Sequence, residues 1–245
     1  MALSLGLHKE FPHWEISLLQ REMRRRVWWG LFIFDSGASI TFGRPVLLPQ
    51  QGIMDACHVL NIDENVRLLS TPENDCCIVL TSNQSLTAQT NLLPMEYTRS
   101  TIYTPLICQS LFHLATNDLH HRLISTPGPT HQELLVLNST IETWESSMPP
   151  YFQISNLEVQ IDETLTFARY RASWRSWNLK ILLSRPVVLQ WALRLKNLDS
   201  NSSSDSIDEL ECRKICTRSA SATISSISDF MATGIVSRLS TWYML

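Results

Sequence analysis

The residues best suited to hold a metal ion are the six cysteines and seven histidines of this 245-residue chain. Cys212 and Cys216 are four positions apart, so on a helix their two thiolates share one face and can reach the same ion. No second pair has a spacing that would complete the ligand set, and the adjacent His120 and His121 point to different faces of a helix. The sequence therefore predicts free thiols, no metal site and no cofactor in this chain.

Motifs that mark common enzyme sites are missing from the sequence. The chain contains no glycine-rich phosphate loop, no Gly-x-Ser-x-Gly turn and no His-Glu-x-x-His element. The sequence therefore predicts that the chain is not an enzyme, and it assigns no catalytic residue. An all-α enzyme whose site has no recognisable motif remains an alternative.

Four arginines lie within six positions, at Arg21, Arg24, Arg25 and Arg26, and they could bind nucleic acid or pair with carboxylates. The whole chain has 20 basic and 23 acidic residues, a net charge of −3 and a pI near 6.2. A domain that binds the nucleic-acid backbone usually has a pI above about 9. Glu22 stands one helical turn before Arg26, where an ion pair forms readily. We expect structural pairing for the cluster, with contact to a partner protein or nucleic acid as the alternative.

Asp35 follows the arginines on a largely apolar helix face, where an unpaired carboxylate is costly. We therefore expect it to have an arginine partner. Arg44 or one of the arginines at 24–26 is the candidate.

Seven helices would position these residues, because apolar side chains recur at close to the 3.6-residue helical period. The expected helices cover residues 11–41, 99–125, 130–147, 161–184, 187–198 and 206–233, and a last one begins near 237. Arg185-Pro186 kinks or ends the fourth of them, since proline lacks an amide donor. This fourth helix has two apolar stripes, which predict packing on two sides. One contains Leu165, Ala168, Ala172, Leu179 and Leu183, and the other contains Phe167, Tyr170, Trp174, Trp177 and Ile181. The class is all-α.

Polar side chains mark where two of these helices begin and where the chain is irregular. Thr130 with Glu133, and Ser206 with Glu209, have the spacing of capping boxes. Residues 46–97 form an irregular and partly flexible connection, and residues 199–206 form a low-complexity polar loop. The longest apolar run, residues 27–34, is too short to span a membrane, so no membrane partner is expected.

The segment from 22 to 45 resembles the core motif of the middle homology region of fungal zinc-cluster transcription factors. The matching residues are Glu22, Arg24, Arg25, Arg26, Trp28, Trp29, Asp35, Gly43, Arg44 and Pro45. Further elements of the family follow in the same order along the chain: Leu5-Gly6-Leu7-His8, Trp144 to Met148-Pro149, Leu182-Leu183-Ser184-Arg185-Pro186, Cys216 with Ala220 and Ile224, and Trp242-Tyr243. The resemblance covers nearly the whole chain, with Met148 and Ser184 as departures from the usual residues.

The resemblance implies a multi-helix, bundle-like regulatory domain whose motif residues, including Arg185 and Pro186, are structural. Residues 1–245 would be a single but partial domain, incomplete at both ends and lacking the zinc-cluster module, so that zinc and DNA binding belong to that module alone. The function implied is control of RNA polymerase II transcription in the nucleus through contacts with transcriptional regulators or other parts of the same factor, with homodimerisation and ligand control as options. The alternative is a helical sensor domain with a small-molecule pocket lined by Trp174 and Trp177.

Overall fold

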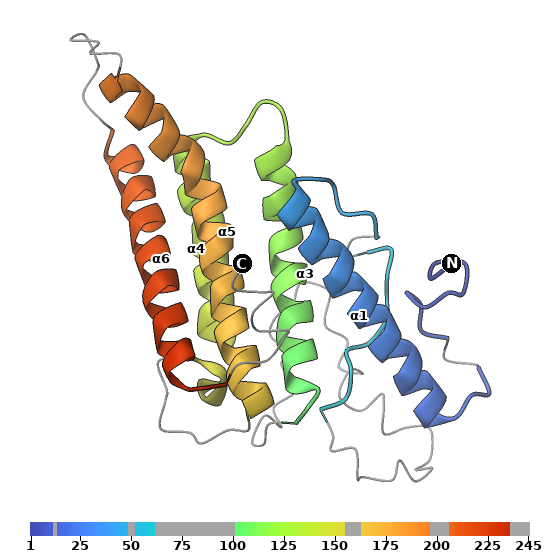
Figure 1. Cartoon of the computed structure of the whole chain (residues 1–245). Helices are drawn as coiled ribbons and strands as arrows, with labels where there is room; N and C mark the ends of the chain where they lie inside the picture. The colour runs from blue at the N-terminus through green and yellow to red at the C-terminus, as the bar shows by residue number, and fades with distance from the viewer. Residues whose placement is uncertain (12–13, 49–51, 62–100, 155–162, 197–205, 236–245) are drawn as a thin grey trace. The chain divides into compact units, whose positions relative to one another are not determined.

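The computed structural model of the chain describes residues 1–11, 14–48, 52–61, 101–154, 163–196 and 206–235 (Figure 1). Its elements are α1 (Leu18–Phe42), α3 (Thr104–Ile124), α4 (His131–Ser147), the short 3-10 helix η2 (Pro150–Phe152), α5 (Glu163–Lys196) and α6 (Ile207–Ala232). No β-strand occurs within the described ranges, which confirms the all-α prediction.

The chain divides into two compact units, Met1–Asn117 and Asp118–Leu245. The first unit contains α1 and most of α3, and the second contains α4, α5 and α6. Whether the whole chain acts as a single domain stays a prediction.

Helix α1 begins at Leu18 and not at residue 11, because a capping box that the sequence analysis missed sets its start. The Ser17 hydroxyl accepts the Gln20 amide at 3.2 Å, and the Gln20 side chain accepts the Ser17 amide at 3.0 Å. The helix ends at Gly43, whose φ of 62° is a left-handed conformation that glycine adopts without strain.

The core of the first unit joins α1 to the start of α3. Its buried members are Trp28, Trp29, Phe32, Met54, Val59 and Ile107. Helix α3 begins at Thr104 and not at 99, since Thr101 and Pro105 favour a start at that point. The Thr101 amide donates to the Thr104 hydroxyl at 2.9 Å, and Pro105 stands in the first turn, where no amide donor is needed.

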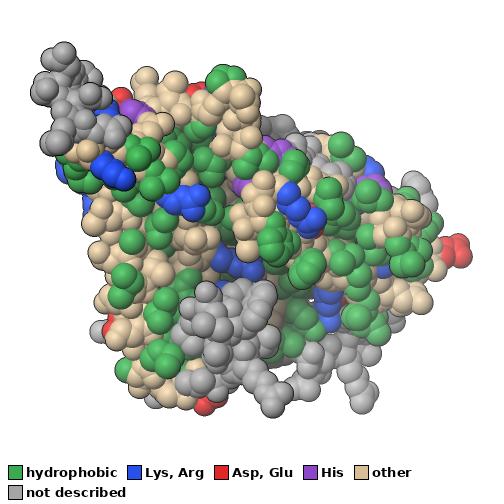
Figure 2. Space-filling model, turned by 45° about the horizontal axis from the view of Figure 1, so that its top comes forward, with side chains coloured by type: hydrophobic (Ala, Val, Ile, Leu, Met, Phe, Trp, Pro, Cys, Tyr) green, Lys and Arg blue, Asp and Glu red, His purple; other side chains and the backbone are tan. Residues whose placement is uncertain are grey.

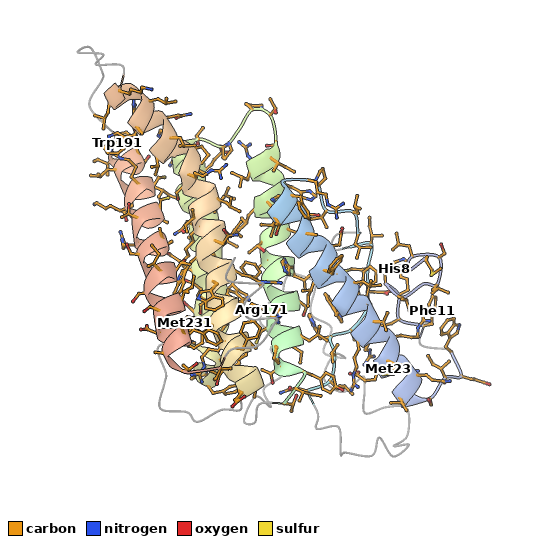
Figure 3. The ribbon with its side chains drawn as sticks, in the orientation of Figure 1. His8, Phe11, Met23, Arg171, Trp191 and Met231 are labelled. Atoms are coloured by element: carbon orange, nitrogen blue, oxygen red, sulfur yellow. The ribbon has the colours of Figure 1, made fainter. Side chains whose placement is uncertain are left out.

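In the second unit α5 packs against both α4 and α6, as its two apolar stripes predict. Tyr170 and Trp174 of one stripe form a buried aromatic cluster with Phe230 of α6, while Leu179 and Leu183 of the other stripe are also buried. Further toward the end of α5, Arg213 of α6 lies 4.6 Å from the ring centre of Trp191 (Figure 3).

Of the two outcomes expected at Arg185-Pro186, a kink or a helix end, the helix end is wrong, because α5 continues through Pro186 to Lys196. A proline removes one hydrogen bond from a helix, and here the packing against α6 on both sides of it maintains the remaining turns. Figure 1 shows the last turns of α5 bending away from the direction of the first ones.

The helix starts at Thr130 and Ser206 are confirmed. Thr130 and Glu133 form a complete capping box. The Ser206 hydroxyl accepts the Glu209 amide, but the Glu209 carboxylate pairs with Arg194 and does not complete a second box.

Some predicted segments lie outside the described residues. These segments are most of the irregular connection 46–97, most of the loop 199–206 and the last helix, which contains Trp242 and Tyr243. The described part of the connection, residues 46–48 and 52–61, is not helical. No described helix has the length and hydropathy needed to cross a membrane.

Candidate functional site

The motif residues of α1 gather in the first unit, and each of three successive arginines binds a different partner. Arg24 holds the N-terminal segment: its Nη2 donates to the carbonyl oxygens of Leu5 at 3.0 Å and Gly6 at 2.9 Å. Its guanidinium also lies 4.6 Å from the ring centre of Trp14. Gly6 has a φ of 61°, and the Phe11 ring lies 3.1 Å from the place of a Cβ, so a residue with a side chain would be strained there. Hydrogen bonds from Arg24 therefore hold the Leu-Gly-Leu-His element against the arginine motif of α1.

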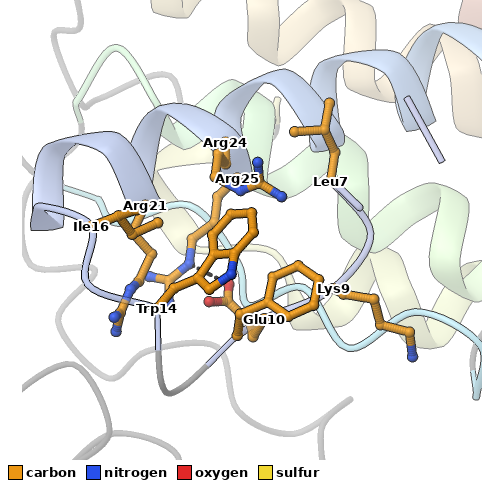
Figure 4. A pocket seen from close by; sticks show the side chains of 9 residues that line it. Leu7, Lys9, Glu10, Trp14, Ile16, Arg21, Arg24 and Arg25 are labelled. Atoms are coloured by element: carbon orange, nitrogen blue, oxygen red, sulfur yellow. Dashed lines mark hydrogen bonds and ion pairs between the residues drawn. The ribbon is translucent and has the colours of Figure 1, made fainter. Parts of the chain in front are cut away.

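Arg25 connects α1 to two other segments through Glu10. Its Nε donates to Glu10 Oε1 at 2.6 Å, and the same oxygen accepts the Cys57 amide at 3.1 Å. Arg25 is 5% exposed, and charge-assisted bonds of this kind are the strongest available to a buried guanidinium. Figure 4 shows Arg25 and Glu10 together beside Trp14.

Glu22 and Arg26 form the expected ion pair one turn apart, at 3.0 Å. Glu22 is fully buried, and burial raises the pKa of its carboxyl although bonds from Arg26 and the Leu60 amide oppose the shift. The Leu60 amide donates at 3.1 Å to Glu22 Oε1, the oxygen that Arg26 Nε also binds. Arg26 Nη1 donates to the Tyr103 hydroxyl at 2.6 Å. This pair thus joins α1 to Leu60 within the connection and to Tyr103 after it.

The two tryptophans Trp28 and Trp29 fill the core, and the Trp29 ring also stacks on His58, a residue that the sequence analysis missed. Trp28 and Trp29 are almost fully buried, and Trp29 Nε1 donates to the Cys57 carbonyl at 2.8 Å. The His58 ring stacks on Trp29, with ring centres 4.7 Å apart and planes within 14°. Desolvation there lowers the pKa of His58 to about 4. No sequence signal marks His58, because it lies in the irregular connection.

Asp35 and the Gly-Arg-Pro element act together where the chain reverses direction after α1. Arg44, the expected partner, lies 3.7 Å from Asp35 Oδ1, which confirms that prediction. The closer contacts were not expected: the amides of Leu47 and Leu48 donate to Asp35 Oδ2 at 2.8 and 2.9 Å. Asp35 stands two turns before the left-handed Gly43, so the reversed chain brings these two amides to its carboxylate.

Arg185 and Pro186 are in the second unit, on the exposed side of α5. Whether they and the α1 residues have a structural role in the sense of the family motif stays a prediction.

The arginine cluster leaves little room for a ligand. The hollow beside it has a volume of about 10 Å³, close to that of one water molecule, and is lined by Arg21, Arg24, Arg25, Phe11 and Trp14 (Figure 4). The arginines at 24–26 already bind carboxylates, carbonyls and aromatic rings. Arrangements of this kind stabilise a fold and do not by themselves carry out a reaction.

Thiol and metal chemistry have no support among the described side chains. No three His, Cys, Asp or Glu side chains of the described ranges are grouped so that they could hold a metal ion. Cys57, Cys108, Cys212 and Cys216 are free thiols. Burial raises the pKa of Cys108 to about 12 and also raises the pKa of Cys212 and Cys216, which opposes formation of the reactive thiolate.

A larger hollow of about 210 Å³ lies in the second unit, between α4, α5 and α6. Trp177 lines it, as the sensor alternative expects, whereas Trp174 belongs to the buried aromatic cluster and donates its indole N–H to Ser226.

Comparison with known proteins gives a family match and several relatives. Residues 1–148 match the family described as fungal specific transcription factor domain. An uncharacterized transcriptional regulatory protein of Schizosaccharomyces pombe is 25% identical over 205 residues, covering 83% of this chain and 24% of the relative. The lactose regulatory protein LAC9 of Kluyveromyces lactis is 25% identical over 99% of this chain and 23% of its own length. The transcription factor FBD3 of Gibberella moniliformis is 22% identical, covering 99% of this chain and 31% of the relative.

The chain thus spans about a quarter of the length of these curated relatives. No solved structure matches it.

Proposed function

Because the chain belongs to the fungal specific transcription factor domain family, whose role in transcription is regulatory, we propose that it regulates its factor in the nucleus through protein contacts and not through catalysis. The family is one of transcription factors, and the named relatives are transcriptional regulators. The motif that characterises the chain serves internal contacts, which leaves partner contacts to other surfaces.

The observation that carries this proposal is an apolar stripe along the outer side of α1. Its members recur every three or four residues, and each is more than two-fifths exposed: Leu19, Met23, Val27, Leu31 and Phe34, with Phe42 at the end. Phe34 is 75% exposed, and Met23 can be seen on α1 in Figure 3. Apolar side chains are also visible at many places on the face shown in Figure 2. A contiguous apolar surface of this kind usually marks a protein contact.

The occupant that we propose is an apolar helix from another part of the same transcription factor. The stripe runs the length of α1, roughly 35 Å at 1.5 Å per residue, which suits a second helix packed along it. Gly30 lies within the stripe, and a Cβ built there meets nothing within 4 Å, so a second backbone can approach closely. The relatives are about three to four times as long as this chain, so factors of this kind contain the additional residues that such a helix needs.

A transcription reporter in a fungal host tests this function. The chain is inserted between a heterologous DNA-binding module and an activation segment, and output is compared with the same fusion without the chain. We expect the chain to change output several-fold. Phe34→Asp in the stripe should remove most of that effect, whereas Ile224→Asp, an equally exposed apolar site on α6, should retain it.

An unchanged output with the native chain contradicts the regulatory function. Equal effects of Phe34→Asp and Ile224→Asp contradict the assignment to α1. Self-association of the isolated chain that Phe34→Asp abolishes would identify a second copy as the occupant, against the proposal.

A further inference from the structure

The hollow of about 210 Å³ between α4, α5 and α6 has no role in the contacts described above. One side of it is apolar, formed by Trp177, Ile215 and Ala222. The Trp177 ring is fixed because it packs against the aromatic cluster of Tyr170 and Trp174. A volume of this size exceeds the roughly 150 Å³ of an engineered cavity that holds benzene, so a small organic molecule fits.

The opposite side of the hollow carries two cations, Lys180 and Arg218, and one carboxylate, that of Glu142. Lys180 is buried and uses one of its three ammonium hydrogens in the 2.7 Å pair with Glu145 Oε2. Ser176 also donates to Glu145, so this carboxylate is already occupied from α5. The remaining hydrogens of Lys180 can serve a ligand.

Two residues of α6 add further donors. Arg218 is 70% exposed and pairs with Glu211 through one nitrogen at 2.7 Å, which leaves N–H groups of its guanidinium that no printed contact of the described ranges uses. Ser219 is buried and lines the hollow; the Thr223 hydroxyl donates to its backbone carbonyl, and its own hydroxyl is a further donor. On the α4 side, Glu142 accepts from Asn138, which places a negative charge opposite the donors.

From this distribution we infer that the hollow binds a small carboxylate with an apolar body. The body lies on Trp177, Ile215 and Ala222, and the carboxylate points toward Lys180 and Arg218, away from Glu142. Carboxylate oxygens satisfy ammonium, guanidinium and hydroxyl donors together, and a planar guanidinium suits them geometrically. The inference rests on the proposed function, because the bound carboxylate is then a signal to a regulatory domain. The binding test itself does not depend on transcription.

The test measures binding to the full chain by thermal shift and by calorimetry. The probes are phenylacetate, benzoate and 4-methylpentanoate, each paired with its neutral amide. We expect at least one carboxylate to raise the melting temperature and its amide to have no comparable effect. Arg218→Gln, at an exposed position, should weaken that carboxylate about tenfold or more.

Two phenylalanine substitutions on α6 test the location. Ala222→Phe fills the hollow and should abolish binding, whereas Ser221→Phe, at the exposed neighbouring position, should retain it. Circular dichroism identifies a variant that does not fold, in which case Arg218→Gln decides alone.

Each contrary result overturns a stated part of the inference. No shift with any carboxylate refutes the site, and equal shifts with the amides refute the anionic class. Binding that survives both Ala222→Phe and Arg218→Gln refutes the location. Carboxylate binding without any reporter effect would support the site and refute the regulatory function. A reporter effect without carboxylate binding would support the regulatory function and refute the site.

Discussion

Asp35 shows how one carboxylate can organise a helix end that lies two turns away. Its Oδ2 accepts two backbone amides, from Leu47 and Leu48, after Gly43 has reversed the chain. The ion pair with Arg44 is longer, at 3.7 Å, and Arg44 is 45% exposed, so it contributes little. The hydrogen bonds to the amides therefore account for most of the stabilisation by Asp35.

Asp35→Asn tests this assignment. We expect the free energy of unfolding to fall by about 1–3 kcal/mol, because two backbone amides lose a charged acceptor. Glu15→Gln, at an exposed site, is the control and should stay within about 0.5 kcal/mol of the native chain. Denaturant midpoints measure both, and equal midpoints for the two variants would show that the Asp35 bonds carry no weight.

His58 gives a prediction for pH. Its pKa is about 4 in the folded chain and 6.5 ordinarily, so between these values the unfolded state binds more protons. Its contribution to stability is therefore complete above pH 6.5 and is lost as the pH falls toward 4. Since 1.36 kcal/mol corresponds to one pKa unit, the loss is at most about 3 kcal/mol, and partial exposure of the residue reduces it.

The check is unfolding as a function of pH in the native chain and in His58→Phe, which preserves a ring to stack on Trp29. The native chain should lose more stability than the variant between pH 6.5 and 4. Parallel curves would mean that His58 titrates as an exposed histidine does.

At the scale of elements, α5 is unusual because it contains a proline in its interior and continues for ten residues beyond it. Pro186 is exposed, and Val187 directly after it is buried. The turns on either side are therefore stabilised by packing and not by a complete hydrogen-bond ladder.

Pro186→Ala should stabilise the chain by about 1–3 kcal/mol, since the new amide can donate to the Leu182 carbonyl and the ring clash disappears. Gln190→Ala, also exposed on α5, is the matched control and should change stability by less than about 0.5 kcal/mol. Thermal unfolding of the three proteins decides the matter. A lower melting temperature for Pro186→Ala would show that the bend itself is needed for packing.

At the scale of the whole molecule, net charge and the contacts of the α1 arginines both disfavour binding to nucleic acid. The net charge is −3, and the arginines at 24–26 are used in contacts with carboxylates, carbonyls and aromatic rings. In the described ranges no group of side chains could hold zinc. Affinity for duplex DNA, which depends on neutralising phosphates, should therefore be weak.

We expect the purified chain to contain no stoichiometric zinc and to bind duplex DNA without sequence preference. Elemental analysis and an electrophoretic shift over a range of salt concentrations measure this. A tight, salt-sensitive complex with a clear base preference would contradict this prediction.

The sequence by itself determined the features that depend on neighbours within one or two helical turns. The helix start at Thr130, the N-cap at Ser206 and the Glu22–Arg26 pair were predictable, because caps and one-turn pairs need only local backbone geometry. The all-α class followed from the period of the apolar residues, and the two-sided packing of α5 from its two stripes.

The tertiary structure alone decided which distant groups the buried polar atoms would meet. Arg24 reaches carbonyls 18 and 19 residues away, Arg25 reaches Glu10, and Asp35 accepts amides that arrive only after the chain reverses. The depressed pKa of His58 likewise depends on desolvation at the place where its ring lies against Trp29. These contacts depend on the path of irregular segments and on the removal of water, and neither is specified by residue spacing. A buried charge must find a partner, but only the folded chain determines which one.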